Sequence, residues 1–170
     1  MSRIVIIGNA GGGKSTLARK LAERRGLRHV EIDRLLWRDG WVLAPTELYM
    51  RQHREVIAGD EWIIDGLGQQ SSIPERIGRA TEIILIDMPI WMHFWLAAER
   101  QIEWAKGALE HPPAGIAQMV PTKDMFRTLW DVDQTWMPQV RALCQEAEAQ
   151  GKLVTRLTSV DALDAFSAAI

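Results

Sequence analysis

The sequence predicts an α/β fold in which parallel strands are joined by helical crossovers. Two observations support this prediction. Strand-type and helix-type segments alternate from one end of the 170-residue chain to the other, and the first apolar strand runs straight into a glycine-rich turn that opens a helix. Strands and helices that alternate in this way form parallel sheets covered by helices. At this length we expect a single domain, residues 1–170.

The first half of the chain contains three predicted strands and three predicted helices. An apolar stripe at 15–25 predicts a helix that stops at Gly26, and Pro45 is typical of a helix start. The apolar run at 62–65 predicts a buried strand that Gly66 ends. In chain order the elements are a strand at 3–8, a helix at 15–25, a strand at 28–32, a helix at 45–59, a strand at 62–65 and a short helix at 74–79.

The second half adds two strands and three helices. The continuous apolar run at 82–88 predicts a strand at the centre of a sheet that is covered on both faces. Between 110 and 122, three prolines and a glycine cannot continue a helix, so we expect a break there and a lid region at about 100–123. Pro138 is placed to kink or split the long helix that follows. The elements are a strand at 82–88, helices at 90–106 and 124–150, a strand at 152–157, and a last helix after Thr158 or Ser159.

Composition and charge exclude several classes of protein. The chain is 47% hydrophobic and 25% charged with a net charge of −2, so it carries no general field that would attract nucleic acid. Cys144 is the only cysteine, which excludes an intrachain disulfide and a multi-cysteine metal site. No uncharged stretch is long enough to span a bilayer. We therefore expect a soluble, cytoplasmic protein with no membrane partner and no direct binding to nucleic acid.

The segment that follows the first strand is predicted to bind a triphosphate. Its spacing, G-x-x-x-x-G-K-S, lets backbone N–H groups approach a phosphate, and the helix that starts near Lys14 turns its positive end toward the anion. Lys14 is expected to reach the β- and γ-phosphates, and the Ser15 hydroxyl to bind Mg²⁺. The residues assigned to this loop are Gly8, Asn9, Ala10, Gly11, Gly12, Gly13, Lys14, Ser15 and Thr16.

Two aspartates at strand ends are candidate site residues. In a parallel α/β sheet, ligands bind beyond the carboxyl ends of the strands. Asp65 ends the third strand and is predicted to hold Mg²⁺, directly or through water, opposite Ser15. Asp33 ends the second strand and faces the same crevice, where it could bind an acceptor hydroxyl, take its proton or hold a Mg²⁺-bound water. The alternative for Asp33 is a helix N-cap.

Three arginines are candidates for binding the groups that react. Phosphoryl transfer needs positive charge near the transferring group. Arg100 precedes the proline-broken stretch and is the preferred candidate for that role. Arg76 and Arg79 lie three residues apart after Gly66, which we interpret as a tight strand exit that lets a substrate approach the backbone. Each arginine could instead be a solvated surface residue.

Eight tryptophans are many for a chain of this length. Trp62, Trp91 and Trp95 lie in apolar segments, and we predict that all three are core residues. Trp37 and Trp41 lie among charges and glycine, where a core role is less obvious. This pair could stack a ring of an acceptor.

These motifs resemble the adenylate kinase-like branch of P-loop kinases. Within it the chain is most similar, over roughly residues 3 to 100, to the group often labelled DNA topology modulation proteins. The resemblance rests on G-x-x-x-x-G-K-S-T-L-A-R-K-L, on Ile32-Asp33-x-Leu35-x-Trp37 with Trp41 four residues later, on Trp62-Ile63-Ile64-Asp65-Gly66, and on Arg76-x-x-Arg79-Ala80 leading into Ile83 to Asp87 and Pro89.

The resemblance implies a three-layer P-loop NTPase fold of the nucleoside monophosphate kinase type, with a five-stranded parallel sheet flanked by helices. It also implies ATP as the donor with Mg²⁺, an acceptor-binding insertion at about 34–60, and a lid arginine at Arg100. The chain departs from adenylate kinases at the two arginines that grip the acceptor phosphate, because Leu36 and the segment Leu67-Gly68-Gln69 stand in their places. These departures do not favour AMP as the acceptor.

Together the residues predict an ATP-dependent phosphotransferase that passes the γ-phosphoryl group to a small acceptor, which could be a nucleotide, a nucleoside or another hydroxyl compound. The predicted catalytic residues are Lys14, Arg100 and Asp33, and the predicted metal ligands are Ser15 and Asp65. The alternatives are a nucleotide-binding regulatory protein with weak ATPase activity and a DNA-binding protein that alters supercoiling. The residues assigned to the acceptor site are Asp33, Trp37, Trp41, Gly66, Arg76 and Arg79.

Overall fold

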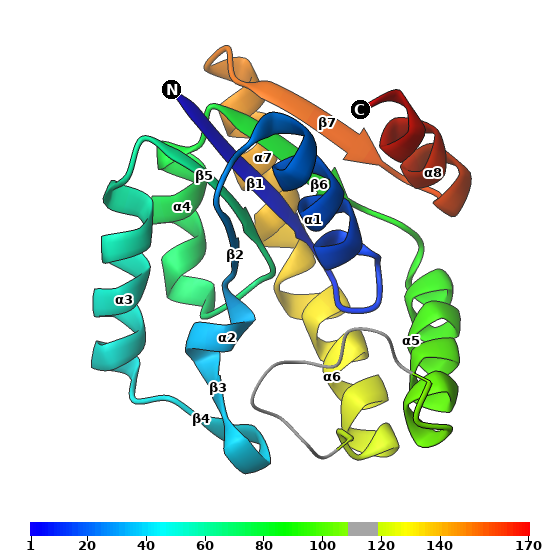
Figure 1. The fold of residues 1–170 in the computed structure, drawn as a ribbon. Helices are drawn as coiled ribbons and strands as arrows, with labels where there is room; N and C mark the ends of the chain where they lie inside the picture. The colour runs from blue at the N-terminus through cyan, green and yellow to red at the C-terminus, as the bar shows by residue number, and fades with distance from the viewer. Residues whose placement is uncertain (109–118) are drawn as a thin grey trace.

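A five-stranded parallel sheet forms the centre of the computed structural model, which describes residues 1–108 and 119–170 (Figure 1). The strand order is β2-β5-β1-β6-β7, so the chain passes from central β1 to the edge strand β2, returns to β5, and then continues on the other side of β1 with β6 and β7. The predicted α/β fold is therefore confirmed, including the number of strands in the main sheet. The strands are β1 (Ser2–Gly8), β2 (His29–Glu31), β5 (Glu61–Asp65), β6 (Glu82–Ile86) and β7 (Leu153–Leu157).

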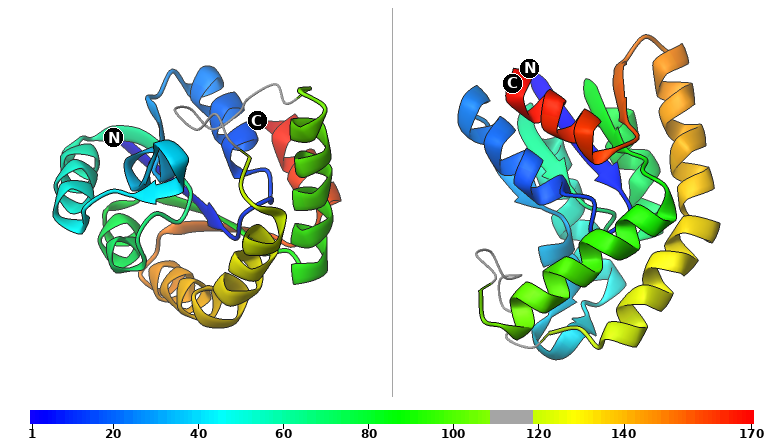
Figure 2. Two further views of the ribbon diagram at one scale, coloured as in Figure 1. Left: turned by 90° about the horizontal axis from the view of Figure 1, so that it is seen from below. Right: turned by 90° about the vertical axis from the view of Figure 1, so that its right-hand side faces the viewer.

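Helices cover both faces of this sheet. Successive residues of a strand pack alternately against the helices on one face and the helices on the other. Val5 and Ile7 of β1 belong to one core, with side chains of α3, α4 and α7, whereas Ile4 and Ile6 belong to the other, with side chains of α1 and α8. Figure 2 shows α1 and α8 on one side of the sheet and α7 on the other. The helices are α1 (Lys14–Arg25), α2 (Asp33–Leu36), α3 (Thr46–Ala58), α4 (Ile73–Arg79), α5 (Ile90–Ala105), α6 (Thr122–Thr135), α7 (Met137–Ala149) and α8 (Val160–Ala169).

Two features of the chain path differ from the simple alternation of strands and helices. The single helix predicted at 124–150 is two helices, α6 and α7, separated at Trp136, and Pro138 lies in the first turn of α7, where proline is tolerated. A small hairpin follows α2 and was not predicted. It pairs β3 (Trp37–Arg38) with β4 (Val42–Leu43) around a 3-10 turn at Asp39–Trp41.

The prediction of a core role is confirmed for Trp62 and wrong for two other tryptophans. Trp62 is 2% exposed, whereas Trp91 and Trp95 of α5 are 62% and 65% exposed. The reason is that α5 carries apolar residues around most of its circumference, and the face it buries is the one with His93, Ala97 and Gln101. Trp95 satisfies its indole N–H by donating to Glu99 Oε1 one turn later, at 2.8 Å.

None of the helices in the described part of the chain is both long enough and apolar enough to cross a membrane.

Candidate active site

The loop between β1 and α1 leaves the first backbone N–H groups of α1 open. Gly13 is the N-cap of α1 and has a φ of 78°, a left-handed conformation that suits glycine. No side chain caps these N–H groups, and the first turn of α1 carries no acidic residue. The N-terminus of a helix with free N–H groups and a positive dipole end favours an anion.

Close packing explains why position 12 is a glycine. Gly12 has no positive φ, but a Cβ there would lie 2.9 Å from Ile86 Cγ2 and 3.0 Å from His93 Cε1. The loop is therefore pressed between β6 and α5. A side chain at position 12 would push the loop away from the sheet.

Hydrogen bonds to α5 and α6 hold the loop between β1 and α1 in place. His93 Nδ1 lies 2.8 Å from the Ala10 carbonyl oxygen, and Asn9 Nδ2 donates to the Leu129 carbonyl oxygen at 2.8 Å. Burial lowers the pKa of His93, so the neutral ring donates its Nδ1–H to this carbonyl. Sequence reasoning missed His93 as a support of the loop, because its contact spans 83 positions of the chain.

Lys14 lies at the centre of the site. It is 8% exposed and donates from Nζ to the Asn9 carbonyl oxygen at 2.7 Å, which folds the side chain back over the loop. Burial lowers the pKa of the Lys14 ammonium, and the negative charges of Asp33 and Asp65 raise it. These effects require that both predicted carboxylates lie near Lys14.

Ser15 and Asp65 form the predicted oxygen pair for a cation. Ser15 Oγ donates to Asp65 Oδ2 at 2.5 Å, and His29 Nε2 lies 2.8 Å from Asp65 Oδ1. Hydroxyl and carboxylate oxygens are hard ligands that suit Mg²⁺. Within the described ranges no group of three or more His, Cys, Asp or Glu side chains could cage a metal ion. This donor set fits Mg²⁺, which usually keeps several waters and binds through few carboxylates and through substrate phosphates.

Asp33 is an exposed carboxylate held at the carboxyl edge of the sheet. It is the first residue of α2, where its side chain does not act as a cap, and Oδ1 accepts from the Gly68 N–H at 3.1 Å. Desolvation raises the pKa of Asp33, whereas the charge of Lys14 and the Gly68 N–H lower it. At Gly66, φ is 103° and a Cβ would lie 2.9 Å from Asp33 Oδ2. The glycine therefore leaves the second oxygen of Asp33 uncovered.

Arg100 joins this group of charges from α5. Desolvation lowers the pKa of Arg100, and the negative charges of Glu31 and Asp33 raise it. The positive charge of Arg100 in turn lowers the pKa of Lys14. Arg100 is therefore within electrostatic range of Lys14 and Asp33. The part of the predicted lid region at 109–118 lies outside the described residues.

The two other predicted arginines have structural contacts. Arg76 is fully buried, and its Nη2 donates to the carbonyl oxygens of Gly66 at 3.1 Å and Leu67 at 3.0 Å, so it supports the turn that follows β5. Arg79 donates to the carbonyl oxygens of Ile57 and Ala58, at the C-terminal end of α3. This end of α3 lies at the opposite edge of the sheet from Asp65, because β5 begins there. The structure does not bring Arg79 to the crevice, and the spacing of the two arginines did not indicate this.

The tryptophan pair lies on the hairpin that follows α2. The ring centroids of Trp37 and Trp41 are 5.6 Å apart in an edge-to-face arrangement, and both residues are partly exposed. Trp41 has a φ of 60°, which is costly for a bulky residue and is commonly found at functional positions. Contact of this pair with an acceptor stays a prediction.

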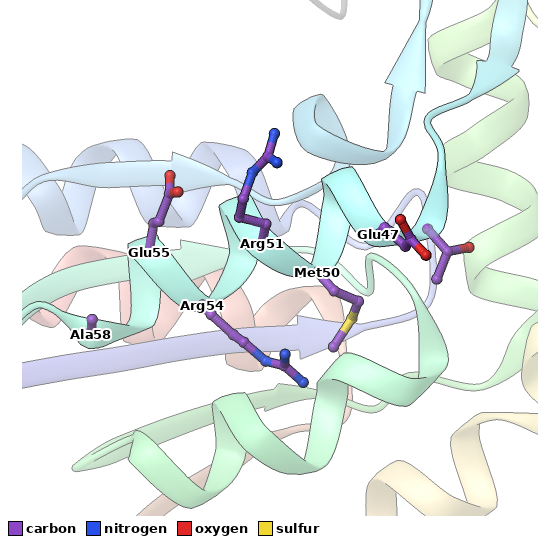
Figure 3. Close-up of a pocket in the computed structure, with 7 residues that line it drawn as sticks. Glu47, Met50, Arg51, Arg54, Glu55 and Ala58 are labelled. Carbon is purple, nitrogen blue, oxygen red and sulfur yellow. The ribbon is translucent and has the colours of Figure 1, made fainter.

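One hollow on the surface lies away from these residues. It is a shallow depression of about 680 Å³ on the outward face of α3 (Figure 3). All of its lining residues come from that one helix: Thr46, Glu47, Met50, Arg51, Arg54, Glu55 and Ala58. With only one helix as its wall, the depression does not contain any of the predicted site residues.

A buried polar cluster lies between α3 and the 3-10 turn at Gln70–Ser72. Tyr49 Oη and Ser72 Oγ are 2.9 Å apart, and the Tyr49 ring stacks on His53 with centroids 6.0 Å apart. His53 has no exposed surface, and burial together with the charge of Arg76 lowers its pKa from 6.5 to about 4. His53 is therefore neutral at physiological pH.

This shift predicts a loss of stability in mild acid. Between pH 6.5 and 4 the unfolded chain binds a proton at His53 that the folded chain does not. The free energy of unfolding should then fall as pH is lowered, and His53 should contribute about 2 kcal/mol of that fall between pH 7 and pH 5. Urea unfolding of the wild type and of His53→Phe at both pH values measures this share, because the other titrating groups are common to the two proteins. Equal pH dependence in the two proteins would contradict the assignment.

Comparison with known proteins finds similarity only among solved structures, and this similarity concerns the fold. No protein-family model matches the sequence, and no curated protein matches it. Among solved structures, the chain is similar to shikimate kinase from Acinetobacter baumannii in complex with shikimate, at 15% identity and a TM-score of 0.63, over 99% of this chain and 90% of that one. A gluconokinase from Sinorhizobium meliloti 1021 has 17% identity and a TM-score of 0.45, over 88% of this chain and 95% of that one. A shikimate kinase from Aquifex aeolicus VF5 has 14% identity and a TM-score of 0.45, over 81% and 98%. The likeness to the first of these establishes that the chain has the fold of a P-loop kinase.

Proposed function

We propose that the protein is an ATP-dependent phosphotransferase that transfers the γ-phosphoryl group to a hydroxyl of a small acceptor. The observation that carries the proposal is the second carboxylate, Asp33, which the Gly68 N–H holds beside Lys14. Binding and slow hydrolysis of ATP need the phosphate loop and the metal ligands. A carboxylate placed opposite them is what transfer to a hydroxyl needs in addition.

Each residue of the site has a different role in the proposed reaction. The amides at the start of α1 and the Lys14 ammonium bind the phosphates of ATP, and Arg100 adds positive charge near the transferring group. Ser15 and Asp65 would hold Mg²⁺, which supplies charge neutralisation at the phosphates. Asp33 orients the acceptor hydroxyl and accepts its proton as the oxygen bonds to the γ-phosphorus. The bond between that phosphorus and the oxygen bridging it to the β-phosphate breaks, and ADP leaves.

The acceptor is proposed to be a small molecule. The similar structure from Acinetobacter baumannii is a shikimate kinase in complex with shikimate, whose name gives a small molecule as its acceptor. In this chain Leu36 is buried and Arg76 is fully buried behind the turn, so neither position offers a cation to an acceptor phosphate. This supports a hydroxyl compound over AMP. The resemblance to DNA topology modulation proteins remains a prediction.

A screen for acceptor-dependent ADP release tests the proposed function. Purified protein with Mg²⁺ and ATP is incubated with nucleoside monophosphates, nucleosides, and small hydroxy acids and polyols, and ADP is measured by a coupled assay. A kinase releases ADP at a rate that depends on one class of acceptor. The same slow ADP release with every compound would instead indicate a nucleotide-binding regulator and would contradict the proposal.

The tryptophan pair is predicted to set the affinity for the acceptor that the screen identifies. Trp37→Phe and Trp41→Phe should each raise the KM for the acceptor several-fold, because an aromatic contact contributes about 1 kcal/mol, while the KM for ATP stays unchanged. Trp91→Phe is the matched control, since Trp91 is an exposed tryptophan on α5. If both hairpin variants keep the wild-type acceptor KM, the pair is not part of the acceptor site.

A further inference from the structure

Asp65 is a buried carboxylate whose two oxygens have different hydrogen-bond partners. Its side chain is 3% exposed, with Ser15 Oγ at 2.5 Å from Oδ2 and His29 Nε2 at 2.8 Å from Oδ1. Within residues 1–108 and 119–170, no lysine or arginine forms an ion pair with Asp65. The orientation of this carboxylate therefore depends on one hydroxyl and one imidazole.

Strand pairing brings His29 to Asp65. β2 runs parallel to β5, with His29 opposite Ile63 and Glu31 opposite Asp65. Residues two apart in a strand point to the same face, so His29, Glu31 and Asp65 share one face of the sheet. The imidazole bridges the offset of two residues between the strands. Val30 lies between them on the opposite face, where it packs against the core with α3 and α4.

The roles of the hydrogen-bond partners follow from the chemistry of the carboxylate. An ionised carboxylate only accepts hydrogen bonds, so Ser15 donates its O–H and His29 donates its Nε2–H. Once Ser15 has used its single proton in this way, its oxygen has only lone pairs left to offer. These lone pairs are what a cation needs.

We propose that His29 is a positioning residue for the Mg²⁺ site, which acts through Asp65 on Ser15. The proposal rests on the Mg²⁺–ATP site proposed above. By holding Oδ1, His29 prevents rotation of the carboxylate that would break the bond from Ser15 to Oδ2. Loss of a hydrogen bond to a metal-ligating side chain weakens metal binding about 10–100-fold, and that is the effect expected when His29 is removed.

The test compares His29→Phe, which removes the donor, with His29→Gln, which keeps an N–H of similar reach. Val30→Ala is the matched control, because it perturbs β2 on the other face. Affinity for Mn²⁺ in the presence of ATP is measured from the electron paramagnetic resonance signal of free Mn²⁺, and affinity for ATP is measured separately in EDTA. We expect His29→Phe to weaken Mn²⁺ binding about 10–100-fold with ATP affinity in EDTA unchanged. His29→Gln should restore most of the loss, and Val30→Ala should resemble the wild type.

Two further measurements keep the proposal testable if His29→Phe does not fold. Nitrogen-15 NMR of the wild type without metal should show a proton on His29 Nε2, and Asp65→Asn should change the His29 signals. His29→Ala, which removes the imidazole without placing a ring in its position, should weaken Mn²⁺ binding about 10–100-fold as expected for His29→Phe.

The outcomes separate this proposal from the proposed function. Wild-type protein that binds neither ATP nor Mn²⁺–ATP would overturn both. Tight Mn²⁺–ATP binding that His29→Phe and His29→Gln leave unchanged would overturn the role of His29 alone. Equal weakening of ATP binding in EDTA and of Mn²⁺ binding would indicate a general structural role and would also overturn it.

Discussion

Lys14→Ala is expected to lose the thermal stabilisation that Mg²⁺–ATP gives to the wild type, while the unliganded protein keeps its fold. Lys14 is the buried cation of the phosphate loop, and its one described hydrogen bond goes to the Asn9 carbonyl within the same loop. A ligand at 100 times its Kd stabilises a protein by about 2.7 kcal/mol, which corresponds to a rise of about 5–10 °C in Tm for a domain of this size. Without the ammonium the phosphates lose the positive charge that the loop itself supplies, and most of this rise should disappear.

Lys20→Ala is the control for this prediction. Lys20 lies on the same helix but is exposed, and its Nζ bonds to Ser167 Oγ of α8 at 3.0 Å. Its removal should leave the shift with Mg²⁺–ATP unchanged. Differential scanning fluorimetry of the three proteins, with and without nucleotide, gives the comparison. If Mg²⁺–ATP raises the Tm of Lys14→Ala as much as that of the wild type, the assignment of the phosphate site is wrong.

Asp33→Asn is expected to have the second largest effect, on transfer and not on nucleotide binding. The amide oxygen of asparagine can still accept from the Gly68 N–H, so the geometry at the start of α2 should persist. The side chain loses the charge that accepts the acceptor's proton, and removal of a general base typically lowers the rate about 10²–10⁴-fold. The Kd for Mg²⁺–ATP should remain near the wild-type value.

Steady-state kinetics with the acceptor found by the screen, together with nucleotide titration, measure both quantities. Asp39→Asn is the control, because Asp39 is an exposed aspartate on the hairpin a few residues away. Asp33→Asn with a kcat within a few-fold of wild type would show that Asp33 binds a hydroxyl or supports the metal without accepting the proton.

Local patterns allowed much of the fold to be predicted. The end of β5 at Asp65, the helix that starts at Lys14 and the five strands are all encoded in short runs of residues. The predicted end of the second strand at Asp33 was wrong, because β2 ends at Glu31 and Asp33 is the first residue of α2. The helix boundary at Trp136 was harder, because a proline two residues later is compatible with either a kink or a new helix. The hairpin at 37–43 has strands of two residues each, which is too short to give a periodic signal.

The parts of the site that sequence reasoning missed are contacts between distant residues. His29 reaches Asp65 across 36 positions and His93 reaches Ala10 across 83 positions, and neither pair has a spacing motif. Burial also separates residues for which the sequence predicted the same role. Arg76 and Arg79 share a short helix, yet one points into the protein and the other caps α3. Only the packing of α4 against its neighbours determines which of the two points inward.

Isothermal titration of the purified wild-type protein with Mg²⁺–ATP tests the central claim most directly. The titration is repeated at several temperatures, because the enthalpy of binding can pass through zero at one of them. Binding of one nucleotide per chain, lost in Lys14→Ala, is the result that the phosphate loop predicts. The absence of any heat of association at every temperature would contradict it.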